Sequence, residues 1–124
     1  MKRFVVVFII FFLQNLSVFA KEFNERYYQN QWCGRWNGKQ EVRLVDFTRI
    51  DCVTKNYAVE FDFAKKWAEC FGQAVHYADL TNKKPACILI LENHKDFIHY
   101  YKASPTFKKH NVTLWYIKSP LYKF

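Results

Sequence analysis

The stretch YAVEFDFAKKWAECFGQAVHYA, residues 57–78, changes its hydrophobic period partway along. Over residues 57–63, large apolar side chains alternate with Ala58, Glu60 and Asp62, which is typical of a strand with two different faces. From Ala64 to Leu80 the apolar residues recur at the spacing of one helical face. They are Trp67, Phe71, Ala74 and Ala78. The stretch therefore predicts a strand that leads directly into a helix, with two carboxylates in the strand.

The residues before this stretch predict one helix and two further strands. Spaced aromatic residues over 23–36 favour a helix, and the segments 41–45 and 49–54 favour strands. Lys55 and Asn56 form a two-residue turn into the strand at 57–63. Three consecutive strands with short turns predict an antiparallel meander.

The residues after it continue the alternation of helices and strands. The run ACILILE, residues 86–92, is uninterrupted apolar sequence and predicts a central strand covered on both faces. Residues 93–111 predict a helix that is broken near Ser104 and Pro105, and residues 112–117 predict a last strand. The fold class is therefore α/β, a mixed sheet flanked by helices in the order α-β-β-β-α-β-α-β. The helix at 64–80 is the crossover to a parallel strand.

The N-terminus has the pattern of a secretory signal peptide. Lys2 and Arg3 precede the apolar segment Phe4 to Leu13, and small residues lead to a cleavage position after Ala20. The apolar segment is shorter than the roughly 20 residues of a transmembrane helix. We expect a signal peptide at 1–20 and a single exported domain at 21–124, periplasmic or secreted. An uncleaved membrane anchor is the alternative.

Four cysteines fall in the expected domain, at positions 33, 52, 70 and 87. An even number in a small exported domain predicts two disulfides, and reduced buried thiols are the alternative. Cys52 alternates away from Asp51 and Cys33 ends the first helix, so we expect these two cysteines to pair. Cys70 lies near the apolar stripe of the second helix and Cys87 lies in the strand that follows, which predicts the second disulfide.

The chain is basic, with a formal net charge of +8 at pH 7. A basic exported domain can bind nucleic acid, anionic lipid or a cell-wall polymer, and it can also be simply a soluble basic surface. The charge alone does not choose between these classes.

The carboxylates of the three predicted meander strands share one side. If the strands pair in sequence order, Glu41, Asp51, Glu60 and Asp62 converge there. Clustered carboxylates either take up protons or hold a cation. Carboxylate oxygens suit Mg²⁺ or Mn²⁺, which can position and activate a phosphodiester for hydrolysis. The alternative is a solvated face whose carboxylates pair with arginines of the same strands.

A polar stripe runs along the predicted helix at 64–80. Its members are Lys66, Glu69, Gln73 and Tyr77, spaced at helical intervals. Because the helix begins beside Glu60, a lysine in its first turn could orient a water or stabilise a phosphate. The amide and the phenol could bind a nucleic-acid backbone. An ordinary exposed helical face is the alternative.

These residues resemble the PD-(D/E)xK nuclease superfamily. The element order, with Asp51 and then Glu60 on consecutive strands, is similar to its catalytic pattern, and QAVHY, Gln73 to Tyr77, is similar to the QxxxY element of its RecB-type branch. The resemblance covers residues 32–92. It implies a restriction-endonuclease-like αβββαβ core followed by a C-terminal αβ. It also implies that Asp51 and Glu60 are catalytic metal ligands, and that Gln73 and Tyr77 contact the substrate.

The same resemblance implies further roles. Glu41 would be an additional metal ligand, with Glu25 on the first helix as its competitor for that position. Asp62 stands where the superfamily pattern has its catalytic lysine. Some relatives carry this lysine on the following helix, so Lys66 is the expected catalytic lysine and Lys65 is the alternative.

The sequence therefore leads to an expected function, an exported Mg²⁺- or Mn²⁺-dependent nuclease that hydrolyses DNA or RNA. Two alternatives stay open. One is a non-catalytic module of the same fold that binds nucleic acid or protein, and the other is a disulfide-stabilised structural protein whose carboxylates are surface groups.

Overall fold

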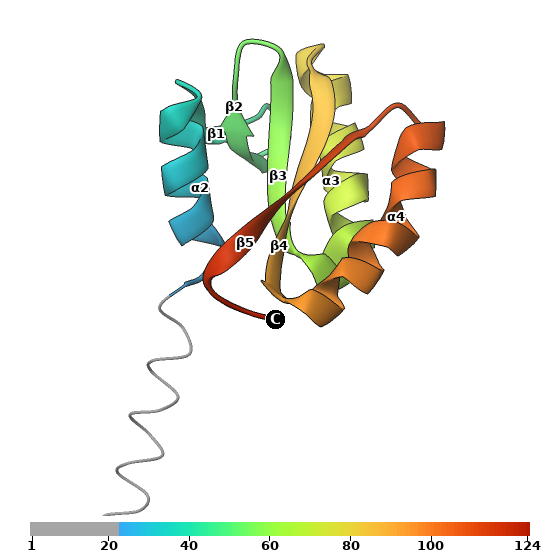
Figure 1. Cartoon of the computed structure of the whole chain (residues 1–124). Coiled ribbons are helices and arrows are strands. Elements are labelled where there is room, and N and C mark those ends of the chain that lie inside the picture. Colours follow the sequence, from blue (N-terminus) through green and yellow to red (C-terminus); the bar gives the residue numbers. More distant parts are fainter. Residues whose placement is uncertain (1–22) are drawn as a thin grey trace, which may run out of the picture.

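The computed structural model describes residues 23–124, and the expected signal peptide lies outside them. One five-stranded mixed sheet forms the centre of the molecule, with the strands in the order β1-β2-β3-β4-β5 (Figure 1). The elements are α2 (Glu25–Arg35), β1 (Lys39–Arg43), β2 (Arg49–Val53), β3 (Tyr57–Phe63), η1 (Ala64–Lys66), α3 (Trp67–Thr81), β4 (Lys84–Asn93), η2 (His94–Asp96), α4 (Phe97–Lys109) and β5 (Thr113–Lys123). No helix in this part of the chain is long and apolar enough to cross a membrane.

The sheet changes from antiparallel to parallel at its middle. β1, β2 and β3 form the expected antiparallel meander, and β3, β4 and β5 run parallel to one another. α3 and α4 make the two parallel crossovers and pack on the same face, while α2 covers the opposite face (Figure 1). When two successive crossovers are both right-handed and proceed along the sheet in the same direction, their helices lie on the same face of the sheet. The fold is thus three layers, with the sheet in the middle.

Most of the buried residues of the sheet lie in β3 and β4. In β3, the alternating residues Val59 and Phe61 face α2. Residues 86–91 of β4 are fully buried, and they alternate between the core beneath α2 and the core beneath α3 and α4. The continuous apolar run thus marks a strand covered on both faces, as the sequence predicts.

Two disulfides tie helices to the sheet on its two faces. Cys33 of α2 bonds Cys52 of β2, and Cys70 of α3 bonds Cys87 of β4, with Cα–Cα distances of 5.9 and 6.1 Å. Both expected pairings are confirmed. The backbone of Gly38 packs directly on the first disulfide, because a Cβ there would lie 2.6 Å from one sulfur and 2.7 Å from the other.

Three features differ from the sequence-based expectations. α4 is not broken at Pro105 but runs through it. Pro105 and Tyr101 are both exposed, so the carbonyl that loses its amide partner lies on the solvent side of the helix. β5 continues to Lys123, well past the expected end at residue 117. Finally, strand alternation would place Ile50 and Cys52 on one face, but they pack in different clusters, Ile50 with Tyr77 and Cys52 beneath α2.

Candidate functional site

The centre of the candidate site lies where β2 separates from β3. The two strands pair through Cys52↔Val59 and Val53↔Ala58. The next position in this register places Asp51 opposite Glu60. There the backbone N–H of Asp51 donates to Oε1 of Glu60 at 3.1 Å, and the N–H of Phe61 donates to Oδ2 of Asp51 at 2.9 Å. The two carboxyl groups thus satisfy backbone donors that the ladder leaves free, which fixes both side chains in place.

Burial makes this pair difficult to ionise. The side chain of Glu60 is only 3% exposed. Burial raises its pKa to about 10, and the neighbouring charge of Asp51 acts in the same direction. Burial also raises the pKa of Asp51 to about 6, although the hydrogen bond from Phe61 opposes the rise. At neutral pH in the absence of a cation, the pair therefore retains a proton.

Asp62 is a third buried carboxyl on the same strand. It is 4% exposed, and burial raises its pKa to about 7. The negative charge of Glu25 on α2 raises it further, whereas the ammonium group of Lys66 lowers it. Lys66 itself is exposed. The end of β3, the start of α2 and the residues before α3 thus bring Asp62, Glu25 and Lys66 together.

Glu41 lies beside Asp51 on the other side of β2. Glu41 and Asp51 are not themselves paired, but the β1–β2 pairs on either side of them place these two residues opposite each other. Its φ of 53° is left-handed, which is uncommon and costly for a residue other than glycine. Its carboxylate accepts a hydrogen bond from Arg26 at 3.2 Å and lies 3.9 Å from Arg49. Glu41 raises the pKa of Asp51, but two arginines already bind it.

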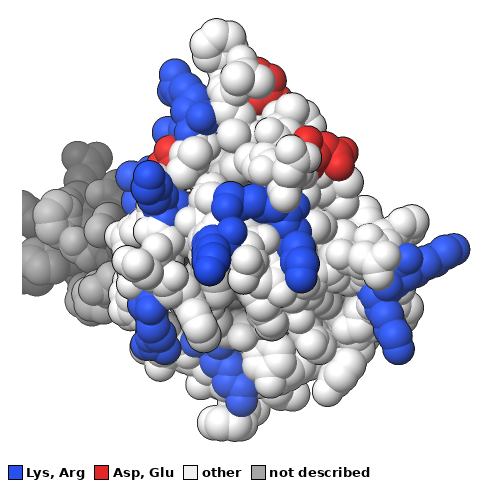
Figure 2. Space-filling model, turned by 90° about the horizontal axis from the view of Figure 1, so that it is seen from above, with Lys and Arg blue, Asp and Glu red and all other residues white. Residues whose placement is uncertain are grey.

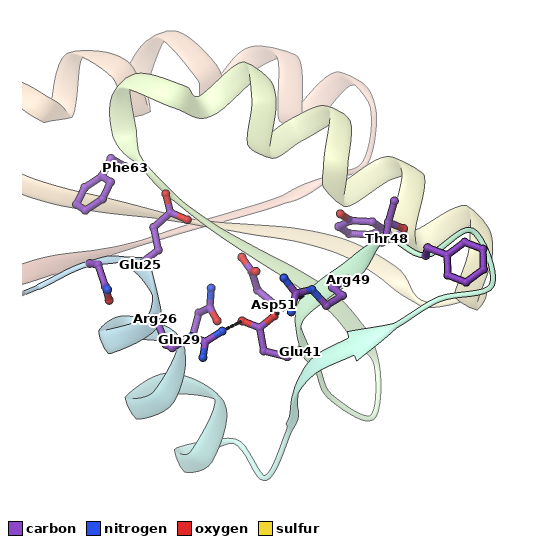
Figure 3. A pocket seen from close by; sticks show the side chains of 11 residues that line it. Glu25, Arg26, Gln29, Glu41, Thr48, Arg49, Asp51 and Phe63 are labelled. Carbon is purple, nitrogen blue, oxygen red and sulfur yellow. Dashed lines mark hydrogen bonds and ion pairs between the residues drawn. The ribbon is translucent and has the colours of Figure 1, made fainter.

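A cavity of about 650 Å³ is lined by Asp51 and Glu41, but Glu60 and Asp62 do not line it. Its lining comes from α2, from β1 and β2 with the turn between them, and from the ends of β3 and α3 (Figure 3). The lining residues are Asn24, Glu25, Arg26, Gln29, Glu41, Phe47, Thr48, Arg49, Asp51, Phe63 and Tyr77. We call this space the acidic cavity. Asp51, Glu41 and Gln29 lie close together at its base (Figure 3).

Gln29 is a site residue that the sequence analysis missed. It is 4% exposed, and its side-chain oxygen Oε1 is buried with no hydrogen-bond partner among residues 23–124. An unpaired buried acceptor is costly, and Gln29 is one of the residues that line the acidic cavity. One signal could have found it. Gln29 precedes Cys33 by four residues, and the disulfide marks that helical face as the inward one.

The structure brings Tyr77 to the acidic cavity but not Gln73. Tyr77 is 6% exposed and packs against Ile50. Burial raises the pKa of Tyr77, and the charges of Glu60 and Asp51 add to the rise. Gln73 is half-buried and does not line the cavity. The expected polar stripe is therefore not one exposed surface, because its last member, Tyr77, is buried at the cavity.

A divalent cation bound beside these carboxyl groups would have to keep most of its own waters. Among the described residues, no group of three or more His, Cys, Asp or Glu side chains is placed to hold a metal ion. Mg²⁺ commonly uses only one or two protein carboxylates, together with waters and substrate phosphate. Asp51 is the one of the pair that lines the cavity, and Glu60 is a second, buried carboxyl group beside it. Glu41 and Glu25 are further carboxylates at the edge of this arrangement.

No model of a known protein family matches this sequence, and no curated protein or solved structure is significantly similar to it.

Proposed function

We propose that this protein is an exported metal-dependent nuclease of the PD-(D/E)xK type, which hydrolyses phosphodiester bonds of DNA or RNA with Mg²⁺ or Mn²⁺. The observation that carries the proposal is the pair Asp51 and Glu60, held by backbone amides, with Asp51 lining an open cavity. The net charge of +8, which falls to +6 when Lys2 and Arg3 are removed with the leader, favours an anionic polymer as the substrate.

The carboxylate pair acts as the cation site in this proposal. When bound there, Mg²⁺ supplies Lewis-acid polarisation of the phosphodiester and activation of water. Asp51 and Glu60 must give up the proton that they retain in the free protein, because carboxylates bind cations as anions.

Other residues of the site act on the substrate. Lys66, whose charge lowers the pKa of Asp62, offsets negative charge that develops on the phosphate during attack. The hydroxyl of Tyr77 orients the substrate strand from the wall of the cavity. Gln73 contacts the strand outside the cavity, and Lys65 is the alternative to Lys66.

The place of action in this proposal is outside the cytoplasm. Both disulfides support it, because disulfides persist in oxidising compartments such as the periplasm and the extracellular space. The apolar leader at 1–20 supports it as well.

A second candidate function is a non-catalytic module that binds nucleic acid or protein. Two observations favour it. Asp62 stands where a catalytic lysine is expected, and Glu41 is held by Arg26 and Arg49 and is therefore less free to bind a cation. Such a module would keep the cavity and the basic surface but would not cleave its ligand.

Metal binding separates the proposed nuclease from a purely structural protein. Calorimetric titration with Mg²⁺ or Mn²⁺ at pH 7, repeated in buffers of different ionisation heats, measures binding and proton release together. We expect one cation to bind with release of roughly one proton, because the carboxyl pair gives up the proton it retains. Asp51→Asn should abolish binding and Asp79→Asn, which changes an exposed residue of α3, should not. Absence of binding in the unmodified protein would refute the metal site.

A further inference from the structure

A second cavity lies toward the C-terminal end of α2. Its volume is about 540 Å³, and it lies between the C-terminal end of α2, the β2–β3 turn and β5. Five aromatic side chains line it: Trp32, Trp36, Tyr57, Trp115 and Tyr116. We call this space the tryptophan cleft. It shares no lining residue with the acidic cavity.

The aromatic rings of the cleft form a fixed floor and an open rim. The ring centre of Trp115 lies 5.8 Å from Trp32 and 5.1 Å from Tyr57. Trp32 is also 5.8 Å from the fully buried Phe61, so the floor is anchored to the hydrophobic core. Trp36 lies 6.0 Å from Trp32 and is 61% exposed. The cleft therefore presents a flat aromatic ring to solvent beside others that the core holds in place.

The charges around the cleft are positive. Lys55 is its only charged lining residue, and no carboxylate lines it. The side chain of Lys83 donates to the carbonyl of Lys55 at 2.9 Å, and the backbone N–H of Lys84 donates to the carbonyl of Asn56 at 2.9 Å. Lys83 and Lys84 are thus held against the turn that forms one wall. Lys and Arg side chains lie across the centre of this end of the molecule, with carboxylates toward its margins (Figure 2).

The basic lining continues along α2. A smaller cavity of about 120 Å³ shares Trp32 with the cleft. Arg35 and Lys118 line it, together with Tyr27, and again no carboxylate does. Aromatic faces and cations thus alternate along the groove between α2 and β5.

We propose that the tryptophan cleft binds single-stranded nucleic acid by stacking its bases on Trp36 and the neighbouring rings, with Lys55 on the phosphates. Aromatic rings beside lysines and arginines are the recurring chemistry of single-strand binding sites. A duplex does not fit this site, because its base faces already stack on one another. The choice of nucleic acid as the ligand rests on the proposed function, but binding in the cleft needs neither metal nor cleavage.

Quenching of tryptophan fluorescence tests this site directly. The protein exported by a bacterial host is titrated with a short oligothymidylate in EDTA, so that no cleavage interferes. We expect Trp36→Ala to weaken binding roughly tenfold or more, the effect of losing one stacked base. Trp36→Phe keeps a ring and should restore most of the affinity. Tyr101→Ala, which removes a ring that is 67% exposed on α4, should leave it unchanged.

The phosphate contribution is tested separately. Lys55→Ala should weaken binding and lower the slope of log affinity against log salt by about one. An abasic oligonucleotide of the same length offers phosphates without bases, so it should bind weakly and equally to the wild type and to Trp36→Ala.

Three results would overturn the inference. The first is wild-type affinity of a folded Trp36→Ala variant. The second is tight binding of the abasic strand, and the third is equally strong quenching by a neutral glycan. Measuring this binding in Asp51→Asn, together with cleavage by the wild type, separates the two proposals. Base-dependent binding without any metal-dependent cleavage by the wild type would retain the cleft and reject the nuclease, whereas cleavage without Trp36-dependent binding would do the reverse.

Discussion

Replacing Asp62 by Asn should make the metal-free protein less sensitive to rising pH. The carboxyl of Asp62 is 4% exposed, and its pKa rises from 3.8 to about 7 on folding. A group whose pKa is raised by folding contributes fully below its unfolded pKa, and stability is lost as the pH rises through the folded pKa. The linkage relation gives a loss of about 1.7 kcal/mol at pH 5 and about 4 kcal/mol at pH 8. The asparagine variant should therefore avoid a loss of about 2.5 kcal/mol between these two pH values.

Thermal unfolding in EDTA measures this difference. For a domain of this size, about 2.5 kcal/mol corresponds to a shift in midpoint of about 10–20 °C. Between pH 5 and pH 8, the midpoint of the wild type should fall by about that much more than that of Asp62→Asn. Glu60 and Asp51, whose pKa values are also raised, should leave a remaining pH dependence in the variant. Asp79→Asn is the matched control and should behave as the wild type. An unchanged slope in Asp62→Asn would refute a buried, costly carboxyl at this position.

Three further predictions concern the fold and the site. Gly38→Ala should lower the free energy of unfolding by about 1–3 kcal/mol in denaturant titration, because its Cβ would contact both disulfide sulfurs. Gly72→Ala, with nothing within 4 Å in α3, should raise it by about 0.5–1 kcal/mol, and equal effects would contradict this packing. Reduction of both disulfides should destabilise the protein by about 4–8 kcal/mol, whereas an unchanged unfolding midpoint in reductant would contradict their structural role. Lys66→Ala should slow cleavage roughly 100-fold and Lys65→Ala should not, and the reverse would assign the lysine to position 65.

The strand at 57–63 and its partner helix could be predicted from sequence because their patterns are local. Period-two alternation defines β3 at its observed ends, and the disulfides follow from which face each cysteine occupies. Cys52 faces the end of α2, where Cys33 lies. Cys87 lies in the strand beneath α3, which carries Cys70. The proximity of Asp51 and Glu60 follows from the same strand register.

The detail of the acidic cavity depends on long-range geometry that local patterns do not encode. The separation of β2 from β3 turns Ile50 toward Tyr77 and opens the space above Asp51. Glu41 of the neighbouring β1 also has a left-handed backbone conformation. Tyr77 fits a polar stripe by spacing alone, yet the open strand pair gives it a buried position. Gln29 gives no signal through its residue type, and only its spacing from Cys33 marks it as inward-facing.

Cleavage of nucleic acid in the presence of metal tests the central claim most directly. The protein exported by a bacterial host is incubated with labelled single- and double-stranded DNA and RNA, with Mg²⁺, with Mn²⁺ or with EDTA. We expect strand cleavage that requires the metal and that falls roughly a thousandfold or more in Asp51→Asn, while Asp79→Asn cleaves as the wild type does. Absence of metal-dependent cleavage on every substrate, or equal cleavage by a folded Asp51→Asn variant, would contradict the assignment of this site as a nuclease centre.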